Sequence, residues 1–103
     1  MRERNIEVYL REQVRKAGGV AYKWVSPGNN GVPDRIVAMP GGRITFVELK
    51  APGKKPTALQ QVQHDRLRAL GCDVRVIDSR KGVDDLIKEL SSGESDTTVH
   101  RPT

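Results

Sequence analysis

Two runs of residues that are rich in β-branched side chains, 35–39 and 44–50, flank a turn with the sequence Pro40-Gly41-Gly42-Arg43. Such residues favour strands, and a short glycine turn between two strands predicts an antiparallel hairpin. The turn also sets the register, because side chains at similar distances from it face one another across the pair. We therefore expect residues near 34 to lie close to residues near 48, at the end of the hairpin away from the turn.

Helical and strand patterns surround this hairpin. Apolar residues spaced by four, four and three predict a helix over 3–17, which Gly18-Gly19 ends. Thr57 is a suitable N-cap for a second helix that runs to Leu70. The other predicted segments are a strand over 20–25, a loop over 26–33, a loop over 51–56, a strand over 73–78 and a helix over 82–90. The order α-β-β-β-α-β-α predicts an α/β fold, a mixed β-sheet flanked by helices, in which the last strand runs parallel to its neighbour.

Length and composition bound the remaining possibilities. A chain of 103 residues with 36% hydrophobic residues fits one domain, which we expect over 1–90, followed by a flexible polar tail over 91–103. No apolar run approaches the roughly 20 residues of a membrane helix, and the charged N-terminus does not resemble a secretory signal. The lone Cys72 excludes an internal disulfide. We therefore expect a cytoplasmic, intracellular protein.

Positive charge gathers in one half of the chain. Residues 1–56 carry a net charge of +6, whereas residues 57–103 carry −1. A one-sided basic surface suits a polyanion such as nucleic acid, although such charge also serves solubility alone. The residues that we expect to contact phosphates are Lys23, Arg35, Arg43, Lys54 and Lys55.

Two carboxylates and an ammonium group converge at the open end of the predicted hairpin. Glu48 and Lys50 are two residues apart and share one face of their strand, and the register brings Asp34 within one residue of Glu48. Two carboxylates and a backbone carbonyl, that of Leu49, form an open site for a hard cation such as Mg²⁺. The cation can bind a phosphate oxygen and make a bound water more acidic. The lysine can hold the attacking water or offset the negative charge that develops on phosphorus. A simple cross-strand ion pair is the alternative interpretation.

The spacing of these residues resembles that of a known nuclease family. Pro33-Asp34, followed 14 residues later by Glu48-Leu49-Lys50, is similar to the PD-(D/E)XK signature, and especially to its VRR-NUC (virus-type replication-repair nuclease) branch in its small phage and bacterial form. The resemblance implies a restriction-endonuclease-like core and a DNA endonuclease that uses Mg²⁺, with Mn²⁺ as a substitute. It also implies a branched substrate, such as a four-way (Holliday) junction.

The same resemblance implies two further site residues. The family places a glutamate of the first helix beside the metal, and both Glu3 and Glu7 are candidates here. It also carries a glutamine on the helix after the lysine, for which Gln60 has the best placement and Gln61 and Gln63 are alternatives.

Other features yield weaker expectations. His64 and His100 have no partners at metal-ligand spacing, so we expect no role for either. A homodimer is expected, because Tyr22, Trp24, Val25 and the last helix offer more apolar surface than a sheet of this size needs. The alternative to an enzyme is a non-catalytic nucleic-acid-binding module that keeps the nuclease fold.

Overall fold

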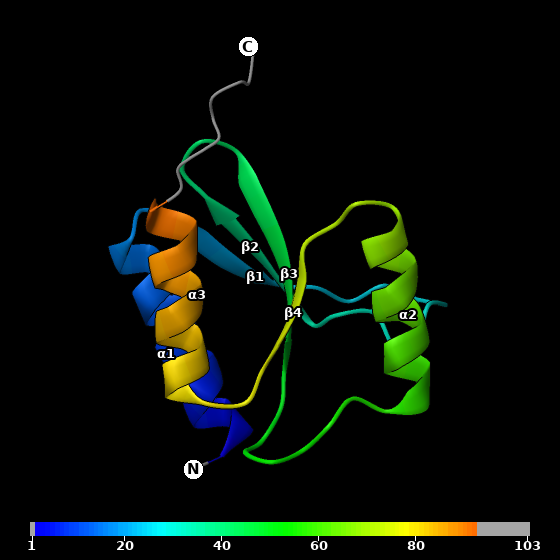
Figure 1. Ribbon diagram of the computed structural model, residues 1–103. Helices are drawn as coiled ribbons and strands as arrows, with labels where there is room; N and C mark the ends of the chain where they lie inside the picture. The colour runs from blue at the N-terminus through cyan, green and yellow to red at the C-terminus, as the bar shows by residue number, and fades with distance from the viewer. Residues whose placement is uncertain (1, 93–103) are drawn as a thin grey trace.

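The computed structural model describes residues 2–92, which form a four-stranded sheet with helices on both faces (Figure 1). The elements follow the predicted order: α1 (Glu3–Lys16), β1 (Val20–Lys23), β2 (Arg35–Met39), β3 (Arg43–Leu49), α2 (Ala58–Ala69), β4 (Val74–Ile77) and α3 (Arg80–Ser92). The predicted α/β class is therefore confirmed. No helix among the described residues is long and apolar enough to cross a membrane.

The strands lie in the order β1-β2-β3-β4, with the hairpin at the centre. β1 and β2 pair antiparallel, as do β2 and β3, whereas β3 and β4 run parallel. The parallel fourth strand was expected, because the chain must cross over through α2 to reach it. The sheet is therefore mixed.

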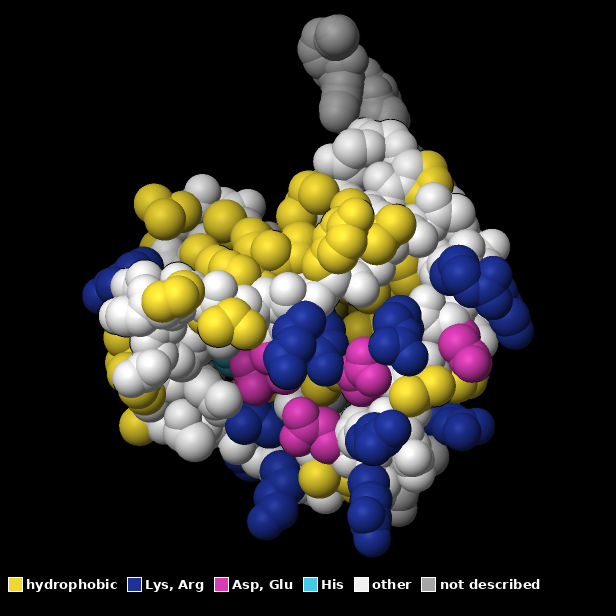
Figure 2. All heavy atoms as spheres, turned by 180° about the vertical axis from the view of Figure 1, so that it is seen from behind, with side chains coloured by type: hydrophobic (Ala, Val, Ile, Leu, Met, Phe, Trp, Pro, Cys, Tyr) yellow, Lys and Arg dark blue, Asp and Glu magenta, His cyan; other side chains and the backbone are white. Residues whose placement is uncertain are grey.

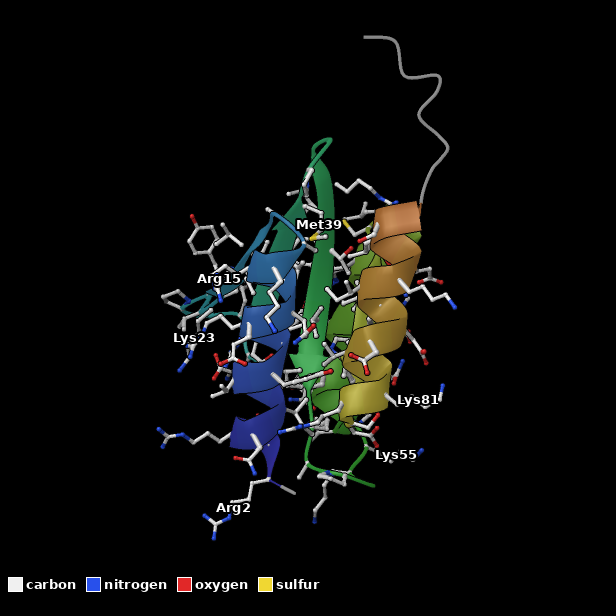
Figure 3. All side chains as sticks on the ribbon, turned by 90° about the vertical axis from the view of Figure 1, so that its left-hand side faces the viewer. Arg2, Arg15, Lys23, Met39, Lys55 and Lys81 are labelled. Carbon is white, nitrogen blue, oxygen red and sulfur yellow. The ribbon has the colours of Figure 1, made fainter. Side chains whose placement is uncertain are left out.

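One face of the sheet carries the hydrophobic core. Alternate residues of β3, Val47 and Leu49, are buried on this face. α1 and α3 lie side by side over it, and Met39 is buried with them (Figures 1 and 3). The helices contribute their apolar stripes, namely Ile6, Leu10, Val14, Val83, Leu86 and Leu90. The intervening residues of β3, Glu48 among them, must then point to the opposite face, where α2 lies.

Two predicted elements, the last helix and the first strand, have boundaries that are wrong by two residues. The last helix begins at Arg80 and not at residue 82, because the Ser79 hydroxyl accepts a hydrogen bond from the Gly82 amide and caps the helix. It also extends to Ser92, so residues 91 and 92, assigned to the tail, are helical. The rest of the predicted tail, 93–103, lies outside the described residues. β1 ends at Lys23, two residues before the predicted end.

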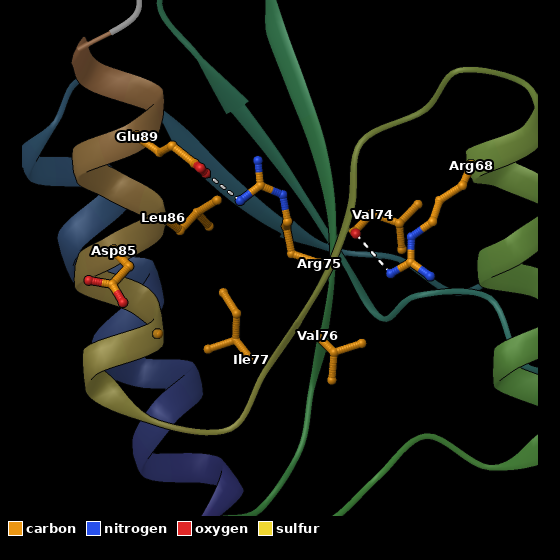
Figure 4. Close-up of a pocket in the computed structure, with 9 residues that line it drawn as sticks. Arg68, Val74, Arg75, Val76, Ile77, Asp85, Leu86 and Glu89 are labelled. Carbon is orange, nitrogen blue, oxygen red and sulfur yellow. Dashed lines mark hydrogen bonds and ion pairs between the residues drawn. The ribbon is translucent and has the colours of Figure 1, made fainter.

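β4 forms one edge of the sheet, and a pocket of about 350 Å³ opens beside it (Figure 4). Arg75 pairs there with Glu89 of α3 and with Asp73, and Arg68 of α2 donates to the Val74 carbonyl at 3.0 Å. Charged side chains along an edge strand discourage pairing with another sheet. This pocket lies apart from the predicted acidic residues, none of which lines it.

Candidate active site

Asp34 and Glu48 meet where β2 begins and β3 ends. Arg35 pairs with Val47 in the hairpin, so the same register, extended by one residue, places Asp34 opposite Glu48. Asp34 is fixed from the neighbouring strand, because its Oδ1 accepts a hydrogen bond from the Leu49 amide at 3.2 Å. The convergence that was predicted from the glycine turn is therefore present.

Burial makes this acidic pair costly to ionise. The Glu48 side chain is only 5% exposed. Burial raises the pKa of Glu48 to about 7, the charge of Asp34 raises it too, and Lys50 opposes the shift. Burial also raises the pKa of Asp34, against the lowering effects of the Leu49 amide and of Arg35. Two carboxylates held together in this way are suited to a cation that neutralises both.

The oxygen ligands of the site fit a hard divalent cation that keeps several waters. Asp34 and Glu48 offer carboxylate oxygens, and the Leu49 carbonyl belongs to the residue whose amide binds Asp34. Across residues 2–92, no three side chains of His, Cys, Asp or Glu are placed to hold a metal together. A cation here therefore needs oxygens from the backbone, from water or from a phosphate in addition to the two carboxylates.

Lys50 contributes the predicted ammonium group. Its Nζ lies 3.7 Å from Glu48 Oε2, and its side chain is 15% exposed. The Lys50 amide donates to the Ile77 carbonyl of β4 at 2.9 Å, which fixes the backbone at this position. The predicted Asp-Glu-Lys set is thus gathered at one end of the sheet.

Gln60 of α2 completes the environment of Glu48. Its Nε2 donates to Glu48 Oε2 at 3.1 Å, and its Oε1 accepts from the Thr57 amide at 2.9 Å. The second bond belongs to the capping box that starts α2. Helix capping therefore orients the amide that contacts the acid. Of the alternatives, Gln61 instead bonds to Asp65 on the same helix.

The two glutamates of α1 occupy different environments. Glu7 pairs with Arg11 at 3.4 Å and with Arg35 at 3.7 Å, so arginines already balance its charge. Glu3 is exposed, and its negative charge raises the pKa of both Asp34 and Glu48. Of the two glutamates, Glu3 is therefore the one whose charge acts on the acidic pair.

The predicted basic residues do not form one group. Figure 2 shows lysine and arginine side chains around a cluster of acidic ones. Lys23, Lys54 and Lys55 are all exposed, and Figure 3 labels Lys23 and Lys55. Arg35 is mostly buried, and it pairs with Glu7 and lies 3.8 Å from Asp34.

Arg43 lies elsewhere. It begins β3, five residues before Glu48, which corresponds to roughly 17 Å along a strand. Its Nη1 donates to the Leu90 carbonyl of α3 at 3.2 Å. The structure therefore separates Arg43 from the other residues that we expected to contact phosphates.

His64 is the site residue that the sequence analysis missed. We expected no role for it, yet it is fully buried and its Nε2 lies 3.7 Å from Glu48 Oε1. Burial lowers the pKa of His64, which favours the neutral ring. The available signal was its spacing of four residues from Gln60, which places both side chains on one helix face. His100 lies outside the described residues.

A mixed sheet that brings an aspartate, a glutamate and a lysine together at the open end of a hairpin defines the PD-(D/E)XK class of nuclease folds.

No protein-family model matches the chain. The chain is 60% identical, over 80 residues, to "Putative nuclease p44" of Acyrthosiphon pisum secondary endosymbiont phage 1, a match that covers 78% of this chain and 86% of that protein.

A solved structure described as a VRR_NUC domain superimposes on the chain with a TM-score of 0.78 and 38% sequence identity. The match covers 84% of this chain and 94% of that one. The chain therefore belongs to the VRR-NUC family, as Pro33-Asp34 and Glu48-Leu49-Lys50 predicted.

Proposed function

We propose that this protein is a DNA endonuclease that hydrolyses phosphodiester bonds with Mg²⁺, and with Mn²⁺ as a substitute. The observation that carries the proposal is the pairing of half-buried Asp34 with buried Glu48 at one end of the hairpin, with Lys50 in contact with Glu48. A protein gains nothing in stability from gathering two carboxylates away from water, so a ligand that needs both is the simplest reason for the arrangement.

Different residues of the chain would serve different parts of the reaction. Asp34, Glu48 and the Leu49 carbonyl would hold the cation, which, when bound, supplies charge to a phosphate oxygen and acidity to a water. The Leu49 amide keeps Asp34 in position, and Gln60 keeps Glu48 in position. Lys50 would hold the attacking water or offset the negative charge that grows on the phosphate as the leaving oxygen departs.

Branched DNA, such as a four-way junction, is the substrate that we propose. Exposed lysines lie on β1 and on the loop that follows β3, on either side of the hairpin end that carries the acids. Phosphates attracted to these lysines would approach the acidic pair from more than one direction, which suits a site where duplex arms meet.

We also propose a homodimer, formed through the part of the sheet that α2 leaves uncovered. Val20, Tyr22 and Ile44 lie on the same face as Glu48 and are 45%, 62% and 48% exposed. Figure 2 shows apolar side chains gathered beside the charged cluster. A symmetric pair would cover this surface with the same surface of a second copy and bring two sites together.

The last helix does not contribute to this surface, contrary to our expectation. The apolar residues of the last helix are not surplus surface, because Val83, Leu86 and Leu90 are buried against the chain's own core. Only the uncovered face of the sheet supports the dimer.

Light scattering tests the dimer. We expect a mass of twice the 11.4 kDa of one chain, and Tyr22→Asp should restore the mass of one chain. A wild-type mass of 11.4 kDa at every concentration would exclude the dimer.

The test of the enzyme is a substrate panel. Labelled duplex, flap and four-way-junction DNA are incubated with the protein in Mg²⁺, in Mn²⁺ and in a chelator. We expect cleavage with either metal, none with the chelator, and the fastest cleavage on the junction. Binding of all three substrates without cleavage in either metal would instead indicate a non-catalytic module.

A further inference from the structure

Three buried polar atoms without hydrogen bonds lie together beside the proposed active site. Among the described residues, four buried side-chain atoms have no hydrogen-bond partner, and three of these are Glu48 Oε1, His64 Nδ1 and His64 Nε2. An unsatisfied buried polar atom destabilises a fold, and native structures contain few of them. Their concentration at one carboxylate indicates an arrangement kept for a purpose other than stability.

Geometry pairs the histidine with one oxygen of the glutamate. Gln60 and His64 are one turn apart on the same face of α2, and both meet Glu48. Gln60 occupies Oε2, whereas His64 Nε2 lies 3.7 Å from Oε1, about 0.7 Å beyond a typical N–H···O bond. A small rotation of either side chain would close this gap, and it would satisfy two of the three atoms at once.

We propose that His64 is a positioning residue, whose Nε2–H donates to Glu48 Oε1 when the carboxylate binds a cation. The inference rests on the proposed function, because it assigns Glu48 to the metal. Gln60 and His64 then hold the two oxygens of Glu48 from one helix. A carboxylate has about four lone-pair sites, so two remain for the cation and its waters. A neutral imidazole carries one proton, which leaves Nδ1 without a hydrogen.

Two substitutions separate positioning from packing. His64→Leu fills the site without a donor, whereas His64→Gln keeps an N–H near the position of Nε2. Mn²⁺ alone, followed by electron paramagnetic resonance, measures cation binding without any need for cleavage. We expect His64→Leu to weaken Mn²⁺ binding about 10–100-fold, as outer-sphere substitutions do, and His64→Gln to restore most of it.

Thermal unfolding and the tautomer provide readouts that are independent of activity. Because His64→Leu removes two unsatisfied atoms, we expect its unfolding midpoint without metal to equal or exceed that of the wild type. Nitrogen-15 NMR of the Mg²⁺-bound protein should show the proton of His64 on Nε2. The effect of His64→Leu on Mn²⁺ binding should vanish in a Glu48→Gln background.

Two outcomes overturn the inference and identify which part has failed. If Asp34→Ala abolishes Mn²⁺ binding but His64→Leu leaves it unchanged, the metal site stands and the positioning role is wrong. A proton found on Nδ1 leads to the same conclusion. If Asp34→Ala itself leaves Mn²⁺ binding unchanged, the proposed function fails, and the role of His64 fails with it.

Discussion

Replacing Gly31 by alanine should damage both stability and the site, through the contact between the loop after β1 and α2. Gly31 has a φ of +93°, and a Cβ there would lie 2.8 Å from the carbonyl oxygen of Leu59, the residue before Gln60. A non-glycine residue in this left-handed region costs about 1–2 kcal/mol. Overpacking against the backbone adds about 1–3 kcal/mol, because Leu59 lies within α2 and must shift with the helix.

Gly28→Ala is the matched control. Gly28 lies in the same loop with a φ of +82°, but a Cβ there would meet nothing within 4 Å. Gly28→Ala should therefore lower the free energy of unfolding only by the conformational cost, about 1–2 kcal/mol. Both substitutions restrict the unfolded chain equally, so this effect cancels in the comparison.

Urea unfolding of the two variants measures the difference between them. We expect Gly31→Ala to be less stable than Gly28→Ala by about 1–3 kcal/mol, and to bind Mn²⁺ more weakly because displacement of α2 moves Gln60 away from Glu48. Equal free energies of unfolding in the two variants would refute the argument that this loop is packed tightly against α2.

Three further predictions concern the acidic pair. Gln60→Leu should slow cleavage because Glu48 loses a hydrogen bond, and it should lower the free energy of unfolding by about 1 kcal/mol because the capping box is lost. Gln61→Leu is the control and should leave cleavage unchanged. Cleavage rates and unfolding of both variants test this. Because the pKa of Glu48 is higher in the folded protein than its ordinary 4.5, its contribution to the stability of the metal-free protein should fall as pH rises from about 4.5 to about 7. Glu48→Gln should remove that fall, and a parallel decline in the variant would contradict the assignment. Lys50→Ala should lower turnover by orders of magnitude with little change in Mn²⁺ affinity, and an unchanged rate would reduce Lys50 to an ion-pair partner of Glu48.

The hairpin could be predicted from local chemistry because its turn dictates its register. Gly41 and Gly42 both have positive φ, and the strands on either side pair so that Asp34 stands opposite Glu48. Gln60 was expected from the family resemblance, and its position agrees with local chemistry, because it forms a capping box with Thr57 at the start of α2.

α2 explains why hydrophobic patterning did not reveal His64. Apolar residues normally mark the buried face of a helix, but Leu59, Val62 and Leu70 at this helix are 50%, 52% and 76% exposed. The inner face of α2 instead carries Gln60 and His64, because it faces a carboxylate and not the core. Hydrophobic periodicity therefore points to the wrong face of a helix that serves a polar site.

The same limitation applies to contacts between distant parts of the chain. Arg43 lies in the basic half of the sequence, but its partner is the carbonyl of Leu90, which only the tertiary fold brings near. Similarly, Glu3 and Glu7 share one helix face in the sequence, and only the position of Arg35 on β2 distinguishes them.

The most direct test of the central claim measures binding and cleavage of a labelled four-way junction by the wild type and by Asp34→Asn, in the same Mg²⁺ buffer. The substitution keeps the size of the side chain but removes its charge, and with it a proposed ligand of the cation. We expect the wild type to cleave the junction, and Asp34→Asn to bind it at least as tightly without cleaving it, because one source of repulsion toward phosphate is gone. Cleavage by Asp34→Asn at the wild-type rate would contradict the assignment of Asp34 and Glu48 as the metal site of this nuclease fold.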